Sequence, residues 1–491
     1  MSPTLFLTVF GLYVTAMIVM SVWIARRQRS GEDFLLGNRS IPLFLSFGTT
    51  VATLVGTGST IGAVGQGYGY GWRGAMYGIG GGIGMLLLAG LFSDARRHNF
   101  MTMAEEVAFY YGANRWMKGL VAIFILFASI GWLGAHILGG SKYLAYIGLM
   151  DPWLAKLVLA SGFSVYVIIG GYVAVVWTDT IQAVVLFFGF ILMAFFAVSE
   201  VGGLSELGSL TGTQLDFLRG DKLLPSISLM VAIAIGVLGV PSFRQRIYSA
   251  DSVSTVRKTF YLTTVLYFLF CFVPAIIGIC AFHLNPNLEE HDHAFLYMSR
   301  DVLPLSIGLV VLLAGLSATM SSASSDAIAA VSVLLRDIYL MFTGKVPSPK
   351  SVIRYTRWGL VGITGAALAV VLPRDDIIDY IKDMIAFVLS GLVVASIMGK
   401  FWPRATWQGG IAAISGGAVC TIAFKFNPAW DAFWGGATIP SVISATLAGI
   451  VVSLVTPPNQ ISEEEALRLL HDERQAMETT QEQVVSESVA D

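Results

Sequence analysis

The sequence predicts an all-α protein that crosses a membrane many times. Hydrophobic residues make up 55% of the 491 positions, and charged residues only 13%. Apolar segments of about 20 residues recur along the chain, each long enough to cross a hydrocarbon core about 30 Å thick as a helix. No segment alternates between polar and apolar residues as the strands of a barrel do, so a helical bundle is the spanning structure that remains.

About thirteen segments are apolar and long enough to be membrane spans. The predicted spans lie near residues 3–25, 42–64, 72–93, 116–140, 153–172, 178–200, 223–243, 259–283, 302–335, 355–373, 378–399, 409–425 and 437–456. No basic residue precedes the first span and Arg26 and Arg27 follow it, so we expect an uncleaved anchor with the N-terminus outside. Most of the 30 Lys and Arg residues, among them Arg244 and Arg246, then fall in loops on the inner side. The sequence therefore predicts a multi-pass protein of the plasma (inner) membrane with a cytoplasmic C-terminus.

Two polar segments lie outside the spans. LEEHDH (288–293) belongs to a predicted outer loop, and both a surface metal site and an ordinary solvated loop remain open for it. The tail, residues 459–491, contains nine acidic residues against two arginines, and Ser462 followed by Glu465 resembles a capping box. We expect one short amphipathic helix there, on the cytoplasmic side.

The ninth predicted span carries an unusual cluster of hydroxyl groups. MSSASSDAIAA (320–330) follows Ser317 and Thr319, and Asp326 is the charged residue within this stretch. Helix geometry places Ser321, Ser322 and Ser325 on one face. Serines also favour close helix packing in membranes, but an intramembrane carboxylate costs at least about 2.5 kcal/mol unless it has a partner. An ion site is favoured over packing alone.

Two other spans are interrupted by residues that weaken helices. ATLVGTGSTIG (52–62) places three glycines and four hydroxyl residues in the second span, and IGVLGVP (235–241) places two glycines and a proline in the seventh. Glycines also serve plain helix packing. A pair of interrupted helices in corresponding positions, however, is typical of inverted-repeat transporters that bind solute between the breaks.

Five groups of residues follow one another in an order that resembles a known family. They are DFLLGNRSI (33–41), GGYVAVVWTDTIQ (170–182), GVPSFRQRI (239–247), MSSASSDAI with RDIY (320–328 and 336–339) and GKFWPRATWQGG (399–410). Together they resemble the sodium/solute symporter family, and several are closest to its choline-transporting branch.

The resemblance implies the leucine-transporter-type fold, in which two repeats of five helices are inverted relative to each other. One helix precedes this core and two follow it, which agrees with the thirteen predicted spans. The implied division is 1–41 for the first helix and its loop, 42–200 for the first repeat, 201–408 for the second repeat, 409–458 for the last two helices and 459–491 for the tail.

The resemblance also implies where sodium binds. The first sodium site takes backbone carbonyls and two hydroxyls from Ala52, Val55, Ala318, Ser321 and Ser322. Some members hold a second sodium ion, and the matching residues are Asp179, Ser321, Ser324 and Ser325. Such oxygen ligands suit a small hard cation. The serine cluster is therefore expected to replace the water shell of one or two sodium ions, and no other cofactor is expected.

The solute is less constrained by the resemblance. A tyrosine gate of the sugar-transporting members corresponds to Gly236, and polar partners of the sugar correspond to Leu54 and Ile233, so a sugar is disfavoured. One tryptophan of the choline branch is retained as Trp132, while other cage positions fall on Leu54 and Ser242. We expect the solute to contact Leu54, Gly56, Thr57, Ser59, Trp132, His136 and Gly236.

Two ionisable residues inside the spans have no role that the resemblance supplies. His136 is either a functional group or a neutral, hydrogen-bonded packing residue. Asp326 either pairs with an arginine at a helix end, tunes the ion sites, or serves ordinary structural pairing.

We therefore expect a sodium-coupled secondary active symporter that imports a small polar solute by alternating access, with a carboxylate, an amino acid or another zwitterion favoured over a sugar. The alternatives are a proton-coupled carrier of the same fold and a membrane sensor that does not transport. The sequence contains no nucleophile elbow, phosphate loop or HExxH motif, so an enzyme is not expected. The expected partners are the solute, sodium ions and the lipid bilayer, without nucleic acid, for a monomer or loose oligomer.

Overall fold

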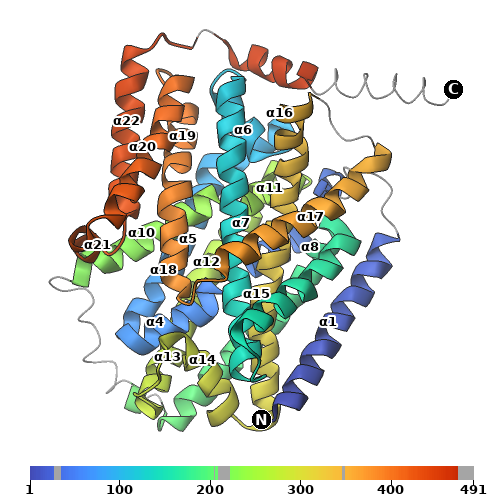
Figure 1. Cartoon of the computed structure of the whole chain (residues 1–491), viewed down its shortest axis with the longest axis vertical. Helices are drawn as coiled ribbons and strands as arrows, with labels where there is room; N and C mark the ends of the chain where they lie inside the picture. Colours follow the sequence, from blue (N-terminus) through green and yellow to red (C-terminus); the bar gives the residue numbers. More distant parts are fainter. Residues whose placement is uncertain (27–34, 204, 208–221, 345–348, 460, 474–491) are drawn as a thin grey trace.

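The computed structural model describes residues 1–26, 35–203, 205–207, 222–344, 349–459 and 461–473, and within them it contains helices and no strand (Figure 1). Nine helices in these ranges are long and apolar enough to cross a membrane, or ten if one bent pair counts as a span. The all-helical prediction is confirmed. The number thirteen stays a prediction, because α8 runs through two predicted spans and a break divides the second.

The helices follow the predicted spans closely. Those of the first 200 residues are α1 (Pro3–Ala25), α3 (Leu43–Leu54), the π-helical turn η2 (Gly58–Gly62), α4 (Ala63–Tyr70), α5 (Gly74–Phe92), α6 (Met103–Tyr110), α7 (Arg115–Tyr146) and α8 (Pro152–Glu200). The later ones are α10 (Leu223–Gly239), α11 (Pro241–Ser249), α12 (Val253–Phe270), α13 (Phe272–Leu284), α14 (Ala294–Tyr297), α15 (Leu305–Val333), η9 (Leu334–Ile338), α16 (Tyr339–Thr343), α17 (Pro349–Val371), α18 (Ile377–Met384), η10 (Ile385–Leu389), α19 (Ser390–Phe401), α20 (Trp407–Lys425), α21 (Pro428–Trp434) and α22 (Thr438–Val455).

Polar side chains cap several of these helices. The Asp151 side chain accepts a hydrogen bond from the backbone N–H of Trp153, and Pro152 supplies the first helical residue of α8. Both choices suit a helix start, because the first N–H groups have no partner inside the helix. Within α8, Gly171 has φ 60°, a left-handed conformation that glycine adopts without strain. It divides α8 where two predicted spans meet.

The serine-rich helix lies in the interior of the bundle. α7 and α15 occupy its middle, and α1 and α22 lie at opposite edges (Figure 1). Every residue of α15 from 314 to 333 is buried. Tyr166 of α8 donates to the Met320 carbonyl at 3.0 Å, and the Tyr13 hydroxyl of α1 lies 2.8 Å from Ser317 Oγ. The hydroxyl groups of α15 therefore face protein rather than lipid.

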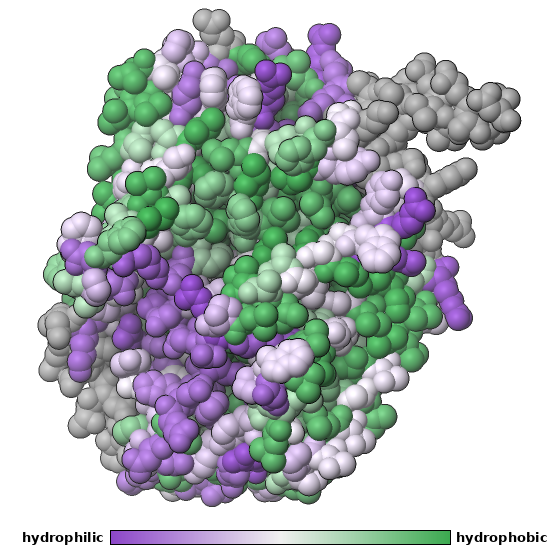
Figure 2. All heavy atoms as spheres, in the orientation of Figure 1, coloured by the Kyte–Doolittle hydropathy of each residue, from purple (hydrophilic) through white to green (hydrophobic). Residues whose placement is uncertain are grey.

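The surface suits a protein surrounded by lipid. Figure 2 shows broad apolar areas over α20 and α22 and over α8, with hydrophilic side chains gathered at the top and over the lower left of the view. Exposed large apolar side chains include Val184, Phe188 and Phe195 on α8. An apolar belt between polar ends is expected where hydrocarbon replaces water around a helical bundle.

The two polar segments take simple roles at opposite ends of the molecule. In the loop after α13, Glu290 and Asp292 approach the Lys142 amine at 2.8 and 3.2 Å. Burial raises the pKa of Asp292 to about 6, so its ion pair with Lys142 forms fully only above about that pH. The Lys142 amine lowers the pKa of Glu290, so the Glu290 pair persists at lower pH. No group of three His, Cys, Asp or Glu residues able to hold a metal occurs in the part of the chain that the structure describes.

The predicted tail helix is present. Residues 463–473 are helical, and Ser462 Oγ accepts a hydrogen bond from the Glu465 N–H at 3.2 Å, as the capping pattern predicts. Glu473 pairs with Lys118 of α7 at 2.8 Å. The helix lies at the end of the molecule opposite the N-terminus (Figure 1). The remainder of the predicted tail, 474–491, lies outside the described residues.

Candidate functional site

Two helices break in the middle of the bundle, where the sequence predicts it. α3 ends at Leu54, and Val55 has the non-helical angles φ −88° and ψ 64°. α10 ends at Gly239, Val240 is extended, and Pro241 begins α11 at an angle of 42° to α10. Each break frees backbone carbonyls that need new partners when water is absent.

Hydroxyl groups beyond the first break supply some of these partners. Ser59 donates to the Leu54 carbonyl at 2.8 Å, and Thr60 donates to the Gly56 carbonyl at 2.9 Å. Tyr267 of α12 in turn donates to Ser59 Oγ at 2.6 Å. Part of the hydroxyl content of the second predicted span therefore stabilises the break itself.

The first predicted sodium site is assembled from α3 and α15. Ser321 Oγ lies 3.0 Å from the Ala52 carbonyl oxygen and 3.2 Å from that of Ala318. Ser322 Oγ lies 3.3 Å and 3.1 Å from the same two oxygens, and 3.0 Å from the carbonyl of Thr53. Val55, the fifth predicted ligand, is buried at the break. We name Ala52, Ala318, Ser321 and Ser322 the neutral oxygen cluster.

The neutral oxygen cluster has the right chemistry for a hard monovalent cation. Hydroxyls can rotate their hydrogens away and offer lone pairs, and both carbonyls are already acceptors. All four residues are buried. The four residues carry no charged group, so a bound cation would be the one charged group in the cluster.

The second predicted site is also assembled, from α8 and α15. Asp179 Oδ2 accepts from Ser325 at 2.8 Å, and Oδ1 accepts from Ser324 at 3.3 Å. Thr49 of α3, which the sequence prediction did not include, donates to Oδ2 at 2.7 Å. Asp179 is fully buried. We name Asp179, Ser324, Ser325 and Thr49 the carboxylate cluster.

A guanidinium group already stands among these oxygens. Arg246 Nη2 lies 3.4 Å from Asp179 Oδ2 and 2.8 Å from both Thr49 Oγ1 and Thr53 Oγ1, and it also donates to Ser325. Arg246 is 1% exposed. The carboxylate cluster therefore contains a cation that belongs to the protein.

The predicted loop position of Arg244 and Arg246 is wrong. Both lie buried in α11, because partners inside the bundle satisfy their charges. Arg244 pairs with Glu106 of α6 at 2.6 Å, and Tyr110 and Tyr248 also donate to that carboxylate. These two arginines fasten α11, the helix after the second break, to α6 and α8. In the sequence, the polar stretch FRQR directly after a proline was the feature that could have indicated a short buried helix with paired arginines.

A cavity of about 40 Å³ lies between the two breaks and α7, enough for about three water molecules. Its walls include five of the seven predicted solute contacts, namely Leu54, Gly56, Ser59, Trp132 and His136. The other two lie just behind them. The Thr57 hydroxyl is 3.1 Å from His136 Nδ1, and a Cβ on Gly236 would lie 3.4 Å from Trp132 Cζ2.

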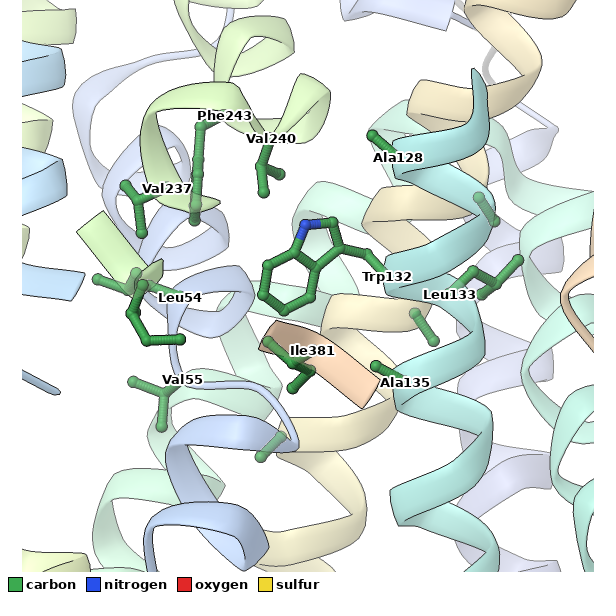
Figure 3. Close-up of a cluster of buried hydrophobic side chains, with 14 of the residues drawn as sticks. Leu54, Val55, Ala128, Trp132, Leu133, Ala135, Val237, Val240, Phe243 and Ile381 are labelled. Atoms are coloured by element: carbon green, nitrogen blue, oxygen red, sulfur yellow. The ribbon is translucent and has the colours of Figure 1, made fainter. Parts of the chain in front are cut away.

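Apolar and aromatic residues complete the walls of this cavity. Figure 3 shows Trp132 projecting from α7 between Leu54 at the first break and Val237, Val240 and Phe243 around the second. The further lining residues that the sequence prediction did not name as contacts are Thr53, Gly58, Tyr77, Ile233, Val237, Val240, Phe243, Tyr267 and Asp326. We name this space the central pocket.

Asp326 neither reaches a helix-end arginine nor joins either oxygen cluster through a described hydrogen bond. Its Oδ2 lies 3.2 Å from His136 Nε2, and both side chains are 4% exposed. The pair lines the central pocket. The two ionisable residues that the sequence left without a role are therefore each other's partners.

Broken helices that meet at a central pocket inside a membrane bundle define the class of secondary transporters. A family model described as the sodium:solute symporter family matches residues 34–417. The chain belongs to this family.

Relatives and solved structures agree with that assignment. A sodium/proline symporter of Salmonella typhimurium is 25% identical and covers 91% of this chain and 93% of its own. A sodium/glucose cotransporter of Vibrio parahaemolyticus is 24% identical, with 86% and 85% covered. The structure of a Na⁺-coupled sialic acid symporter in a substrate-bound outward-open state superposes with a TM-score of 0.81 at 18% identity, covering 93% and 98%. This last likeness shows the fold.

Proposed function

We propose that this protein is a sodium-coupled symporter that imports a small polar organic solute by alternating access. It works in the plasma membrane with its N-terminus outside and its C-terminus in the cytoplasm. A carboxylate, an amino acid or another zwitterion suits the central pocket better than a sugar, because apolar Leu54 and Ile233 line it at the positions that correspond to the sugar's polar partners. The observation that carries the proposal is the neutral oxygen cluster, which joins α3 to α15 beside that pocket.

The first break couples the ion to the solute. Sodium in the neutral oxygen cluster holds the last turn of α3 against α15, and Leu54 and Gly56 of the same break face the pocket. A Cβ on Gly56 would lie 2.6 Å from Ser322 Oγ and 2.9 Å from His136 Cε1. Reciprocity then requires the solute to tighten sodium binding by the factor that sodium tightens solute binding, typically about 1 to 3 kcal/mol.

One sodium ion accompanies each solute in this mechanism. The carboxylate cluster supplies ligands for a second ion, but the Arg246 guanidinium already compensates the Asp179 charge. A second sodium ion there would have to bind beside a buried cation, and like charges at such short range repel. The neutral oxygen cluster has no such competitor.

Substitution of Gly56 tests the coupling. Gly56→Val places side-chain atoms against Ser322 and His136, so it should abolish solute binding with a smaller loss of sodium binding. Isothermal calorimetry of the purified protein, in sodium and in potassium, measures both affinities. Gly11→Val is the matched control, since a Cβ there has no neighbour within 4 Å. A wild-type solute affinity that is equal in sodium and potassium contradicts the proposed function.

One observation favours a second candidate, a proton-coupled carrier. The His136–Asp326 pair lines the pocket and contains two groups that can bind a proton. Uptake into proteoliposomes separates the candidates. A pH gradient without sodium should drive no accumulation if the protein is a sodium symporter, whereas accumulation under that condition identifies the proton carrier.

A further inference from the structure

The central pocket contains one carboxylate whose purpose the sodium sites do not explain. Asp326 lies on α15, four residues after Ser322, and lines the pocket with its partner His136. Among the residues that line the pocket, Asp326 is the one with a carboxylate group. A carboxylate at membrane depth is costly unless a partner compensates its charge. A single neutral imidazole supplies only one hydrogen bond.

One turn before His136 on α7, the Trp132 ring stacks on the imidazole at 6.2 Å and offers an unused hydrogen-bond donor. Trp132 is 9% exposed, and its indole Nε1 is buried without a hydrogen-bond partner. In Figure 3 this nitrogen is turned toward the side of Val240, away from the α7 backbone. A buried tryptophan N–H normally finds an acceptor, so the pocket presents a free donor as well as a carboxylate.

Aromatic rings line the same pocket. Tyr77, Trp132, Phe243 and Tyr267 all line the pocket, and the faces of aromatic rings attract cations. The remaining walls are mostly apolar, so they exclude water and strengthen any charge pairing inside.

We infer that Asp326 is the counter-charge for a cationic nitrogen on the solute, and that the Trp132 N–H receives an acceptor group on the same molecule. The solute is thus a zwitterion with an ammonium group and a carboxylate. This inference rests on the proposed function and narrows it, because a simple carboxylate would meet the negative charge of Asp326 without a partner.

His136 links this recognition to the first break. Its Nδ1 lies 3.1 Å from Thr57 Oγ1, and the Thr57 hydroxyl lies 3.2 Å from Thr319 Oγ1 of α15. When the solute nitrogen pairs with Asp326, His136 keeps its contact with Thr57 and gives up the bond from Nε2. No proton transfer is required for this exchange.

Matched ligand pairs test the charge requirement. We would measure the shift in melting temperature of the purified protein in saturating sodium with L-proline against cyclopentanecarboxylate, and with glycine betaine against 3,3-dimethylbutanoate. The members of each pair have similar shapes and differ in the cationic nitrogen. We expect at least one zwitterion to raise the melting temperature and neither nitrogen-free analogue to do so. Equal stabilisation by an analogue, or no stabilisation by either zwitterion, overturns the inference.

Substitution of Asp326 tests whether this residue binds the cationic nitrogen of the solute. Asp326→Asn should lower the affinity for the stabilising zwitterion at least about 30-fold, as expected when one partner of a buried charge pair is removed. The rise in melting temperature that sodium alone produces should be the same in this variant as in the wild type. A general structural defect would change that rise. Asp326→Glu keeps the charge and should retain part of the affinity if the asparagine variant does not fold. Unchanged zwitterion affinity in Asp326→Asn overturns the assignment.

Asp337→Asn is the control. Asp337 is also a buried aspartate, on η9, which continues α15, but it does not line the pocket. The outcomes separate the inference from the proposed function. Sodium-dependent uptake of a solute without a cationic nitrogen would support the proposed symporter and contradict the role inferred for Asp326. Zwitterion binding that requires Asp326 but not sodium would support that role and contradict the proposed sodium coupling.

Discussion

The neutral oxygen cluster and the carboxylate cluster both lie where α15 meets other helices, yet they differ in how charge is balanced. Both contain serine hydroxyls of the same helix. In the first, Ser321 and Ser322 contact only carbonyl oxygens. In the second, Ser324 and Ser325 contact Asp179, whose charge Arg246 compensates. Hydroxyl groups alone therefore do not identify an ion site. What distinguishes the two clusters is the protein cation, Arg246, that the second contains.

Removal of Arg246 should have the largest effect. Arg246→Gln leaves the buried Asp179 carboxylate without its cation, and breaking a buried ion pair in this way costs about 3 to 5 kcal/mol. We expect a strong fall in melting temperature and loss of transport. High sodium should partly restore stability, because the ion can then occupy the carboxylate cluster. A variant that is as stable as the wild type in sodium-free buffer contradicts the proposed charge balance.

Removal of Asp179 should have a smaller effect. Asp179→Asn leaves Arg246 with its hydroxyl partners, so we expect a loss of about 1.5 to 3 kcal/mol, typical of a hydrogen bond to a charged group. The double variant with Arg246→Gln should be more stable than Arg246→Gln alone. The sodium Hill coefficient of uptake should be near one in the wild type and remain so in Asp179→Asn. A coefficient near two that falls to one would instead establish a second sodium ion.

Substitution in the neutral oxygen cluster should change sodium binding with little change in stability. Ser322→Ala removes one ligand, and we expect the sodium concentration for half-maximal uptake to rise about tenfold, equivalent to 1.4 kcal/mol. Ser396→Ala is the matched control, because Ser396 is buried and bonds only to the Leu392 carbonyl of its own helix. Ser396→Ala should keep the wild-type sodium dependence. If Ser322→Ala keeps it as well, the assignment of the sodium site to the neutral oxygen cluster fails.

The smallest effect is expected at Thr49. Thr49→Val keeps the shape but removes a hydroxyl that donates to Asp179 and accepts from Arg246. We expect a loss of about 1 kcal/mol in the free energy of unfolding and an unchanged sodium requirement. A raised sodium requirement in this variant would show that the carboxylate cluster takes part in coupling.

Sequence patterns predicted the features that depend on local chemistry. The apolar segments gave most helices within a few residues, and the glycines at 56, 58 and 62 together with Pro241 located both breaks. Helix periodicity places Ser321, Ser322 and Ser325 on one face. The family resemblance grouped Asp179 of the WTD motif with Ser324 and Ser325, and in the structure these side chains are in contact.

Sequence patterns could not predict which distant side chains meet. Arg246 reaches Asp179 across 67 positions, and His136 reaches Asp326 through the packing of α7 against α15. A basic residue after a span satisfies the positive-inside rule as well as it satisfies a buried ion pair, so Arg246 was placed in a loop. Only the direction of α11 after the break at Val240 shows that Arg246 is buried in an ion pair and does not lie in a loop.

Under the proposed mechanism, the buried arginine would also set how far the solute can be concentrated. Because Arg246 stays with the protein, a zwitterion carried with one sodium ion would move one elementary charge per cycle. At a membrane potential of 100 mV and a tenfold sodium gradient, that charge supplies about 2.3 kcal/mol and the gradient about 1.4 kcal/mol. The sum allows accumulation of roughly 500-fold, whereas a second sodium ion would square that ratio. If one sodium ion accompanies the solute as proposed, a single guanidinium would lower the maximal accumulation ratio to its square root and halve the sodium influx per solute.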